Sequence, residues 1–372
     1  MLRTFRPRIA ISSRWTTWPS SIHRLGQHRI HRFSNLDPTK PPLIEEYQVG
    51  WVCALSKELT AARAMLDEEH EPFKSDNVRD NNSYVLGRVG EHNVVMACLP
   101  AGVYGTNAAA TVANNMLRTF TGLRFGLMVG IGGGIPNLEK EVDIRLGDVV
   151  VSQPDKTHGG VVQYDLGKNL GEGNFERKGF LRPPPTVLLT ALSNLQSQHD
   201  LDGSQIPKFL AEMIKRRPNL AKSGYGCPGP EKDCLFCCHL ENLTGNGRCT
   251  RCQNGTIQRE ARDDQHPVVH YGVIASGNEV IKNAAERDRL GEALGAKCVE
   301  MEAAGLMNEF PCIVIRGICD YADAHKNDVW QKYAATTAAA FAKELLLVVR
   351  LTEVAGTKHA ADMMSESNQA SP

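Results

Sequence analysis

Residues 94–134 read VVMACLPAGVYGTNAAATVANNMLRTFTGLRFGLMVGIGGG and decide the fold class. The stretch begins with an apolar run (94–99), passes through a glycine-containing turn into an alanine-rich helical pattern (106–120), and ends in a second apolar run (125–129). Apolar runs without alternation are typical of strands buried on both faces, and a helix between two such strands predicts a parallel arrangement. We therefore expect a β–α–β unit with glycines 130–134 at the end of its second strand.

The same alternation of strands and helices continues on both sides of this unit. Strands that alternate with helices predict a three-layer α/β/α fold around a central mixed, largely parallel sheet. Residues 218–266 are polar, rich in glycine and cysteine and without periodicity, and we interpret them as an insertion on the surface of this core. The further strands are predicted over 47–54, 149–151, 268–275 and 311–315, and the further helices over 57–68, 187–196, 206–215, 279–294 and 329–352.

The two ends of the chain differ from its centre. Residues 1–46 are interpreted as an extension and linker, and the first 36 of them contain seven arginines and no acidic residue. That composition is typical of a mitochondrial transit peptide, and a basic tail on a cytoplasmic protein is the alternative. Residues 47–352 are predicted to form the folded domain, and the polar residues 353–372 are predicted to be a disordered tail.

The composition excludes several classes of partner. Lysine plus arginine and aspartate plus glutamate are equal at 42 each, so no net charge draws the chain to nucleic acid or to an anionic membrane. No apolar run reaches the roughly 18 residues that a membrane-spanning helix needs. With 42% apolar and 23% charged residues, the chain is predicted to be globular, with neither nucleic acid nor membrane as a partner.

Acidic residues and glycines follow four of the predicted strands. They are Glu58, the glycine run 130–134, the segment Glu300–Glu302, and Asp320. Ligands of open α/β sheets lie beyond the carboxyl ends of the strands, so these groups are expected to share one site. Acidic residues at helix starts are also ordinary caps, which is the structural alternative for Glu300 and Glu302.

Three stretches together resemble the nucleoside phosphorylase and nucleosidase superfamily. They are CVEMEAA at 298–304, RGICDYAD at 316–323 and GVIASGN at 272–278, and the resemblance covers about residues 47–350 apart from the insertion. The HYG form at 270–272 and the stretch 316–323 look most like the fungal branch, in which the domain often precedes nucleotide-binding or repeat domains. None follows here, so we expect a free-standing member. Because the superfamily is generally oligomeric, with a neighbouring subunit completing the pocket, the resemblance also implies a homo-oligomer.

The resemblance implies roles for single residues in cleaving a purine–ribose bond. Such cleavage needs a proton or hydrogen bond for the departing base, a partner for the sugar hydroxyls and a nucleophile at the anomeric carbon. Asp320 matches the residue that serves the purine N7, and Glu302 matches the carboxylate that holds the ribose. Glu58 matches the carboxylate that activates water in the methylthioadenosine/adenosylhomocysteine nucleosidases. The substrate-binding positions implied are Met301 at the sugar, Glu300 as a weaker candidate, Val280 and Ile281 at the base, and Ala54, Ala101, Gly102, Gly130, Ser276 and Asn278 around the pocket.

Water is the predicted nucleophile. The resemblance implies that a phosphorylase would carry an arginine near the position of Glu58 and another in the third strand, where this chain reads MVGI at 128–131. Like charges about 4 Å apart repel by about 4 kcal/mol at an effective dielectric of roughly 20, so a carboxylate disfavours phosphate there. The favoured function is a purine nucleosidase acting on a nucleoside such as adenosine or methylthioadenosine, or on a nucleotide such as AMP or ATP.

Three further possibilities stay open. A phosphate-dependent purine nucleoside phosphorylase of the same fold would rebuild its anion site from arginines such as Arg88 or Arg145. A non-catalytic purine-sensing or signalling module would not need the carboxylates at all. The turn Ala101–Gly102 departs from the Ser-Gly pair of the small-nucleoside enzymes, which motivates a nucleotide substrate whose phosphates meet a lysine or arginine of another loop.

The insertion carries a cysteine pattern that indicates a metal site. Cys234, Cys237, Cys249 and Cys252 form two C-x₂-C pairs with 11 residues between them. Four thiolates in two such pairs suit tetrahedral Zn²⁺, although cysteines that cluster by chance in a loop are the alternative. We expect this zinc to be structural and distant from the reaction, because the chemistry needs no cofactor.

Overall fold

The computed structural model describes residues 42–72, 79–171, 174–236 and 256–363. The predicted transit peptide and three of the four predicted zinc ligands, Cys237, Cys249 and Cys252, lie outside these residues. The core of the described part is one mixed sheet with the strand order β11-β10-β6-β12-β5-β1-β4-β3-β2, and β7 pairs with β10. Its strands are β1 (Val49–Cys53), β2 (Glu68–Glu69), β3 (Tyr84–Val89), β4 (His92–Cys98), β5 (Phe125–Gly134), β6 (Val149–Ser152), β7 (Val161–Gln163), β10 (Val269–Ser276), β11 (Ala296–Glu300) and β12 (Cys312–Asp320).

The predicted β–α–β unit is present and spans the centre of this sheet. Strands β4 and β5 both pair in parallel with β1, which lies between them, and helix α2 (Thr106–Thr119) makes the crossover. The second strand is longer than predicted, because β5 continues through the glycines to Gly134. The glycine segment is held on both sides, since β12 pairs with Gly130–Gly133 and β11 pairs antiparallel with Gly133 and Gly134. Because of this pairing, β11 and β12 both end beside the glycine segment of β5.

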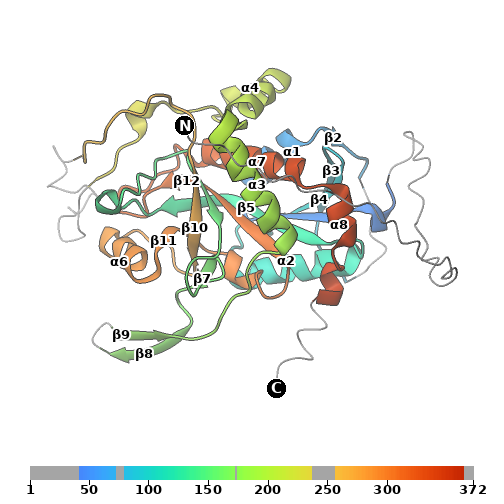
Figure 1. The fold of residues 1–372 in the computed structure, drawn as a ribbon, viewed down its shortest axis with the longest axis horizontal. Helices are drawn as coiled ribbons and strands as arrows, with labels where there is room; N and C mark the ends of the chain where they lie inside the picture. The colour runs from blue at the N-terminus through green and yellow to red at the C-terminus, as the bar shows by residue number, and fades with distance from the viewer. Residues whose placement is uncertain (1–41, 73–78, 172–173, 237–255, 364–372) are drawn as a thin grey trace, which may run out of the picture. The chain divides into compact units, whose positions relative to one another are not determined.

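Helices cover both faces of the sheet, which confirms the three-layer prediction (Figure 1). One layer contains α1 (Ser56–Met65), α3 (Thr186–Asp202), α4 (Ile206–Arg216) and α7 (Gln331–Val348). On the other side lie α2 and the short helix η6 (Ala303–Gly305), while α6 (Ala284–Leu294) packs against β10 and β11. A separate hairpin of β8 (Gly167–Gly171) and β9 (Asn174–Arg177) projects from the sheet.

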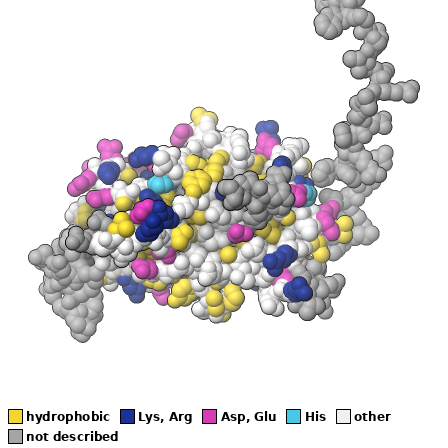
Figure 2. Space-filling view, turned by 90° about the horizontal axis from the view of Figure 1, so that it is seen from below, with side chains coloured by type: hydrophobic (Ala, Val, Ile, Leu, Met, Phe, Trp, Pro, Cys, Tyr) yellow, Lys and Arg dark blue, Asp and Glu magenta, His cyan; other side chains and the backbone are white. Residues whose placement is uncertain are grey.

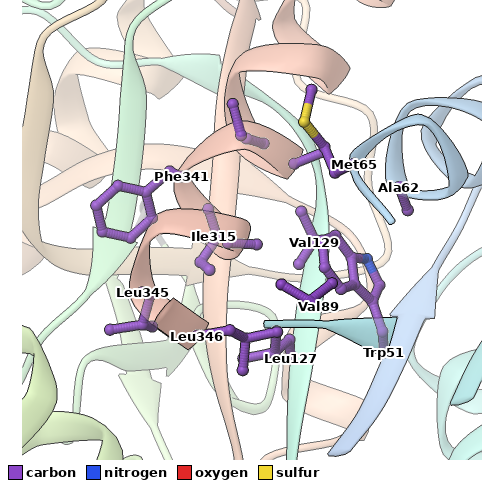
Figure 3. Packing of buried hydrophobic residues seen from close by; sticks show 14 of the residues in the cluster. Trp51, Ala62, Met65, Val89, Leu127, Val129, Ile315, Phe341, Leu345 and Leu346 are labelled. Atoms are coloured by element: carbon purple, nitrogen blue, oxygen red, sulfur yellow. The ribbon is translucent and has the colours of Figure 1, made fainter. Parts of the chain in front are cut away.

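The apolar layer between the sheet and α7 fixes the strands that carry the site (Figure 3). Trp51 of β1, Leu127 of β5 and Ile315 of β12 are buried in one apolar cluster with Phe341 and Leu345 of α7. Fully burying such a side chain contributes roughly 1.5–3 kcal/mol, so this layer holds β1, β5 and β12 rigidly side by side. Groups at the ends of these three strands are therefore presented on a fixed support.

Three differences from the predictions concern helix α6 and the C-terminal part of the chain. Helix α6 begins at Ala284, not near residue 279, because the Asn283 side chain caps it by accepting hydrogen bonds from the N–H groups of residues 285 and 286. The predicted helix 329–352 is divided into α7 and α8 (Leu351–Gly356). Residues 353–363, expected to be disordered, are ordered because Val354 and Ala360 are fully buried and the Ala360 N–H bonds to the carbonyl of Leu123. Residues 364–372 lie outside the described part.

The surface shows charges of both signs. Figure 2 shows acidic and basic side chains interspersed on one face, with hydrophobic side chains exposed between them. Large apolar side chains are exposed in and beside the β8–β9 hairpin, at Leu166, Leu170, Phe175 and Phe180. Among the described helices, none has both the length and the apolar character required to cross a membrane.

Candidate active site

A cavity of about 330 Å³ lies where the central strands end. Its walls come from the start of α1 after β1, from Ile131–Gly133 of β5, from Val299–Glu302 at the end of β11, and from Cys319 of β12. Tyr104 and Val280 also line it and are each about half exposed. The structure therefore brings Glu58, Glu300, Glu302 and the glycine run to one cavity, as the strand-end argument predicts.

A larger cavity of about 450 Å³ lies elsewhere, between the described part of the insertion and residues 145–148. None of the three predicted catalytic carboxylates lines it. Its arginines Arg259 and Arg262 are engaged by Asp233 and Asp148, at 2.7 Å each. Chemistry and not volume therefore identifies the smaller cavity as the candidate site.

Glu58 is fixed by three backbone N–H groups from two strand ends. Its Oε2 accepts hydrogen bonds from Ala54 (2.7 Å) and Leu55 (2.9 Å), and its Oε1 accepts one from Ile131 (2.9 Å). Burial raises the pKa of Glu58, and the guanidinium of Arg316 and the three N–H groups oppose that rise in part. A buried carboxylate with a raised pKa and spare acceptor capacity at the cavity wall suits a general base.

Arg316 is a central residue of the site to which the sequence reasoning assigned no role. It lies in β12, is fully buried, and pairs in register with Gly130 of β5. A Cβ on Gly130 would collide with Nη1 of Arg316 and Oε1 of Glu58, so both groups lie directly over that glycine. Within the described residues, Nη1 and Nε of Arg316 are buried without a hydrogen-bond partner. The signal in the sequence is a lone arginine inside the apolar strand CIVIRGICD.

The two glutamates of the VEME segment have different surroundings. Glu300 forms an ion pair with Arg316, and its Oε2 also accepts from the N–H groups of Glu302 (3.1 Å) and Ala303 (3.0 Å). The capping alternative therefore describes Glu300, whose oxygens are engaged. Glu302 has only long contacts, 3.4 Å from the Gly105 N–H and 3.5 Å from Arg316 Nη2. Burial, opposed by Arg316 and reinforced by Glu300, raises the pKa of Glu302 to about 7.

Asp320 is the last residue of β12, and the described contacts of its carboxylate are all with hydrogen-bond donors. Its Oδ1 accepts from the Ala322 N–H (2.8 Å), and its Oδ2 lies 3.0 Å from the Cys319 thiol and 3.2 Å from Nζ of Lys326. Burial disfavours the Lys326 ammonium, but Asp320 and, to a smaller extent, Cys319 outweigh it and raise the pKa of Lys326. Lys326 lines the cavity, and Asp320 lines a small adjoining space of about 50 Å³. Sequence reasoning missed Lys326, because its segment has no periodic pattern.

The other predicted substrate-binding residues divide into two groups. Ala54, Val280, Ile281 and Met301 line the cavity. Ser276 and Asn278 do not, because their side chains accept hydrogen bonds from the N–H groups of Ala304 (2.9 Å) and Thr106 (3.1 Å). Ala101 and Gly102 form an exposed turn away from the cavity, and Tyr104 and Gly105 of the same segment approach it instead.

The described part of the insertion contacts the residues next to Asp320. Asp233 accepts a hydrogen bond from the Tyr321 hydroxyl, and Arg259 donates to both Asp233 and Tyr321 (2.7 and 2.9 Å). Phe236 stacks on His325 with 3.9 Å between ring centroids and 17° between ring planes. The described part of the insertion therefore lies beside the end of β12 and the segment that follows it. The zinc site itself stays a prediction; among the described residues there is no group of three or more metal-binding side chains.

The arginines named for a rebuilt phosphate site do not reach this cavity. Arg88 pairs with Glu68 on the exposed sheet edge (3.0 Å), and Arg145 pairs with Asp143 (2.6 Å) and lines the larger cavity. Neither residue lines the cavity that holds the carboxylates. The phosphorylase alternative therefore lacks the anion site proposed for it.

Comparisons with known proteins agree with this fold. The sequence profile described as Phosphorylase superfamily matches residues 245–350. A nucleotide-binding leucine-rich repeat (NLR)-like protein of Hyaloscypha variabilis is 52% identical over 305 residues, so 82% of this chain matches 30% of that protein's length. The 5′-methylthioadenosine/S-adenosylhomocysteine nucleosidase of Mycobacterium tuberculosis is 23% identical over 80% of this chain and 95% of its own.

The solved structures give the same result at the level of the fold. The 5′-methylthioadenosine/S-adenosylhomocysteine nucleosidase of Helicobacter pylori matches 81% of this chain and 98% of its own, with a TM-score of 0.52 and 17% sequence identity. The sequence profile and the relatives point to the same superfamily that the stretches VEMEA at 299–303 and RGICD at 316–320 resemble. Together, the sequence profile, the relatives and the fold support the nucleoside phosphorylase and nucleosidase superfamily, with features of its methylthioadenosine nucleosidases.

Proposed function

We propose that this chain is a purine nucleosidase that hydrolyses the N-glycosidic bond of a purine nucleoside or nucleotide to free base and sugar. The observation that carries the proposal is the facing pair of Glu58 and Arg316 over Gly130. The nucleosidases among its relatives support the same reaction class. Each step below follows from the surroundings of one side chain.

The Glu58–Arg316 pair is suited to activating water. A water at the cavity wall would donate a hydrogen bond to the carboxylate of Glu58, which lines the cavity, and the buried guanidinium of Arg316 lies beside that carboxylate. As the water oxygen bonds to the anomeric carbon, Glu58 takes its proton. The raised pKa of Glu58 makes the carboxylate a stronger base than an exposed glutamate.

Glu302 is the group best placed to hold the sugar. Its long contacts leave acceptor capacity for ribose hydroxyls, and Met301 beside it offers an apolar surface. Hydrogen bonds from sugar hydroxyls to a carboxylate strengthen as positive charge develops on the ribose ring. Glu300 acts indirectly, because its ion pair positions the guanidinium of Arg316.

The charge balance of the site favours water over phosphate. Glu58, Glu300, Glu302 and Asp320 contribute four carboxylates, and Arg316 and Lys326 contribute two cations that are already paired with them. A phosphate dianion would enter a region with excess negative charge. Phosphate sites instead offer arginines with several free donors.

One observation favours a nucleotide among the candidate substrates. Lys57, the residue before Glu58, bonds through Nζ to the neutral side chain of Gln331, which lines the cavity. Its charge is thus not neutralised by that partner, and we infer that it meets a 5′ phosphate of the substrate. If so, Lys57→Gln lowers kcat/KM for AMP or ATP at least tenfold and leaves adenosine within about twofold. An equal effect on all three substrates would contradict this role.

The experiment that tests the proposed function is a substrate panel. Purified protein is incubated with adenosine, methylthioadenosine, inosine, guanosine, AMP and ATP, and the free base and sugar product are followed by chromatography. Release of a purine base from at least one compound, abolished by Glu302→Ala, is the expected result. Protein that binds purines but releases no base from any of them would instead establish the non-catalytic sensing alternative.

A homo-oligomer is part of the proposal and is supported by the exposed surface near the site. Tyr104 and Val280 at the cavity and Phe175 and Phe180 at the hairpin are large apolar side chains open to solvent. A second subunit that covers them would also narrow the cavity. Light scattering after size exclusion, expected to give at least twice the chain mass, tests this state.

A further inference from the structure

The start of helix α2 lies against Glu302, the carboxylate proposed to hold the sugar. The N–H of Gly105 is 3.4 Å from Oε1 of Glu302, and the preceding residue, Tyr104, lines the cavity. The same segment also contacts the helix η6 that follows Glu302, because a Cβ on Gly305 would collide with the carbonyl oxygen of Thr106. The position of the start of α2 therefore decides where Glu302 meets its backbone donor.

The start of α2 is capped by a side chain from another element. The first N–H groups of a helix need acceptors outside the helix, but the N-cap residue of α2 is Gly105, which has no side chain. Asn278, two residues beyond the end of β10, supplies the acceptor, and its Oδ1 accepts hydrogen bonds from the N–H and the hydroxyl of Thr106 at 3.1 Å each. It also packs on Gly105, where a Cβ would lie 2.9 Å from the same oxygen. Asn278 therefore fixes the start of α2 relative to β10.

Asn278 is itself held in one orientation by Asp165. Oδ2 of Asp165 accepts hydrogen bonds from the backbone N–H (2.7 Å) and from Nδ2 (3.1 Å) of Asn278, while Oδ1 accepts one from Nε2 of Gln163 (2.9 Å). Burial raises the pKa of Asp165, but the hydrogen bonds from Asn278 and Gln163 outweigh burial and lower that pKa. Because a carboxylate only accepts, the amide nitrogen of Asn278 faces Asp165 and its oxygen faces Thr106.

The carboxylate of Glu302 is oriented by two donors. Its Oε1 lies beside the Gly105 N–H, and its Oε2 lies 3.5 Å from Nη2 of Arg316. Both contacts are long, so a small displacement of the start of α2 would remove the first of them and leave the carboxylate free to rotate about its last bond. Arg316 is held separately, by Glu300. The Gly105 contact is therefore the one that Asn278 controls.

We propose that Asn278 is a positioning residue for the sugar, because its cap on α2 keeps the Gly105 N–H on Glu302. This inference rests on the proposed function, in which Glu302 binds the ribose hydroxyls. Asn278 does not line the cavity, so it acts through Glu302 and not through contact with the substrate. Loss of the cap should therefore weaken interactions with the sugar and leave those with the base unchanged.

The test compares a ligand that carries the sugar with one that lacks it. Formycin A, an adenosine analogue whose carbon–carbon glycosidic bond is not hydrolysed, and free adenine are titrated by calorimetry into the full chain, Asn278→Ala and Asp165→Ala. In Asn278→Ala the backbone bond to Asp165 can remain, so the residues at the base that follow keep their support. Asn283→Ala is the matched control, since Asn283 also caps a helix, α6, through its side-chain oxygen but does not line the cavity. Thermal unfolding establishes that each variant is folded.

The expected result is a loss that is confined to the ligand with the sugar. The full chain and Asn283→Ala bind formycin A more tightly than adenine; Asn278→Ala and Asp165→Ala lower this preference at least fivefold, and Asn278→Ala keeps its affinity for adenine within about twofold. If the folded variants keep the preference within fivefold, or lose affinity for both ligands equally, the inference is overturned and the proposed nucleosidase stands. If the full chain binds adenine but does not prefer formycin A, Glu302 does not hold the sugar and the inference fails with that step. If neither ligand binds, the purine site itself is overturned.

Discussion

The substitution Glu58→Gln tests the base of the proposed reaction with a small change of shape. The carboxylate accepts three backbone N–H bonds, two at Oε2 and one at Oε1. A glutamine amide has a single oxygen, so its NH₂ group must face either the Ile131 N–H or the N–H groups of Ala54 and Leu55. An unsatisfied buried donor costs about 1–3 kcal/mol, so the variant is expected to unfold at a lower temperature but to remain folded at 25 °C.

The expected loss of catalysis is larger than the loss of stability. A positioned general base contributes about 10²–10⁴-fold to the rate, which corresponds to roughly 3–5 kcal/mol of barrier. Glu58 makes none of the described contacts of Lys326 and Asp320, so binding of the base should change little. We therefore expect kcat to fall at least 100-fold and the dissociation constant for the free base to stay within about threefold.

The assay follows base release at saturating substrate, with Glu344→Gln as the matched control. Glu344 is also a buried carboxylate that accepts a backbone N–H, from Gln205, but it lies in α7 outside the cavity. The control should lose comparable stability and keep kcat within about twofold. If Glu58→Gln retains more than a third of the wild-type kcat, Glu58 is not the base and the reasoning from the Glu58–Arg316 pair is refuted.

Four further predictions address the site and the insertion beside it. The pKa of Glu302 is about 7 in the folded state in place of 4.5, so the stability of the wild type should fall as pH rises through that window. Glu302→Gln removes this group, so its stability relative to the wild type should be roughly 2–3 kcal/mol higher at pH 8 than at pH 5. Urea unfolding of both proteins at both pH values measures this difference in stability, and a difference that does not change with pH would contradict the assigned pKa. In the wild type, kcat/KM should fall as pH drops below about 7, since protonated Glu302 loses its acceptor role. Gly130→Ala should lower kcat at least 100-fold, because displacing reacting groups by about 1 Å can have that effect, and unchanged kinetics would show that nothing lies over this glycine. Arg259→Met should lower the stability of the fold by about 1–3 kcal/mol, because it removes the charged partner of the partly buried Asp233 and leaves only the bond from Tyr321. It should also speed hydrogen exchange in residues 321–327, and unchanged exchange there would mean that the insertion does not hold this segment.

The central strands and helices could be predicted because their buried residues form apolar patterns in the sequence. The strands β1, β4, β5, β6, β10 and β12 and the helices α1 to α4 follow such patterns. Strands β3 and β11 were missed, since YVLGRV and AKCVE mix polar and apolar residues and become strands through pairing with β4 and β10. The end of β5 was missed for the same reason, because pairing on both sides keeps a glycine run extended.

The site was predictable only where it is carried by a contiguous motif. Glu58, Glu302 and Asp320 were found through the resemblance, and the structure gathers them around one end of the sheet. The role of Arg316 follows from its pairing opposite Gly130, and this pairing is set by the tertiary structure and not by the local sequence. Lys326 is placed by an irregular segment that the insertion holds.

Polar residues at strand ends were the commonest false signal. Ser276 and Asn278 occupy positions where ligand-binding residues are expected, but backbone N–H groups of neighbouring elements take their side chains first. Whether such a side chain is free to bind a ligand depends on how closely the start of a neighbouring helix approaches the strand. The pattern of residues in the sequence does not contain that distance.

The measurement that tests the central claim most directly is the dependence of base release on phosphate, with the sugar product identified. The best substrate of the panel is incubated with and without phosphate, and both products are separated by chromatography. The account predicts the same rate in both conditions, with free sugar, or ribose that keeps its original 5′ phosphates, as the product. Release that requires phosphate and yields ribose 1-phosphate would contradict water activation by Glu58 and would make the chain a phosphorylase.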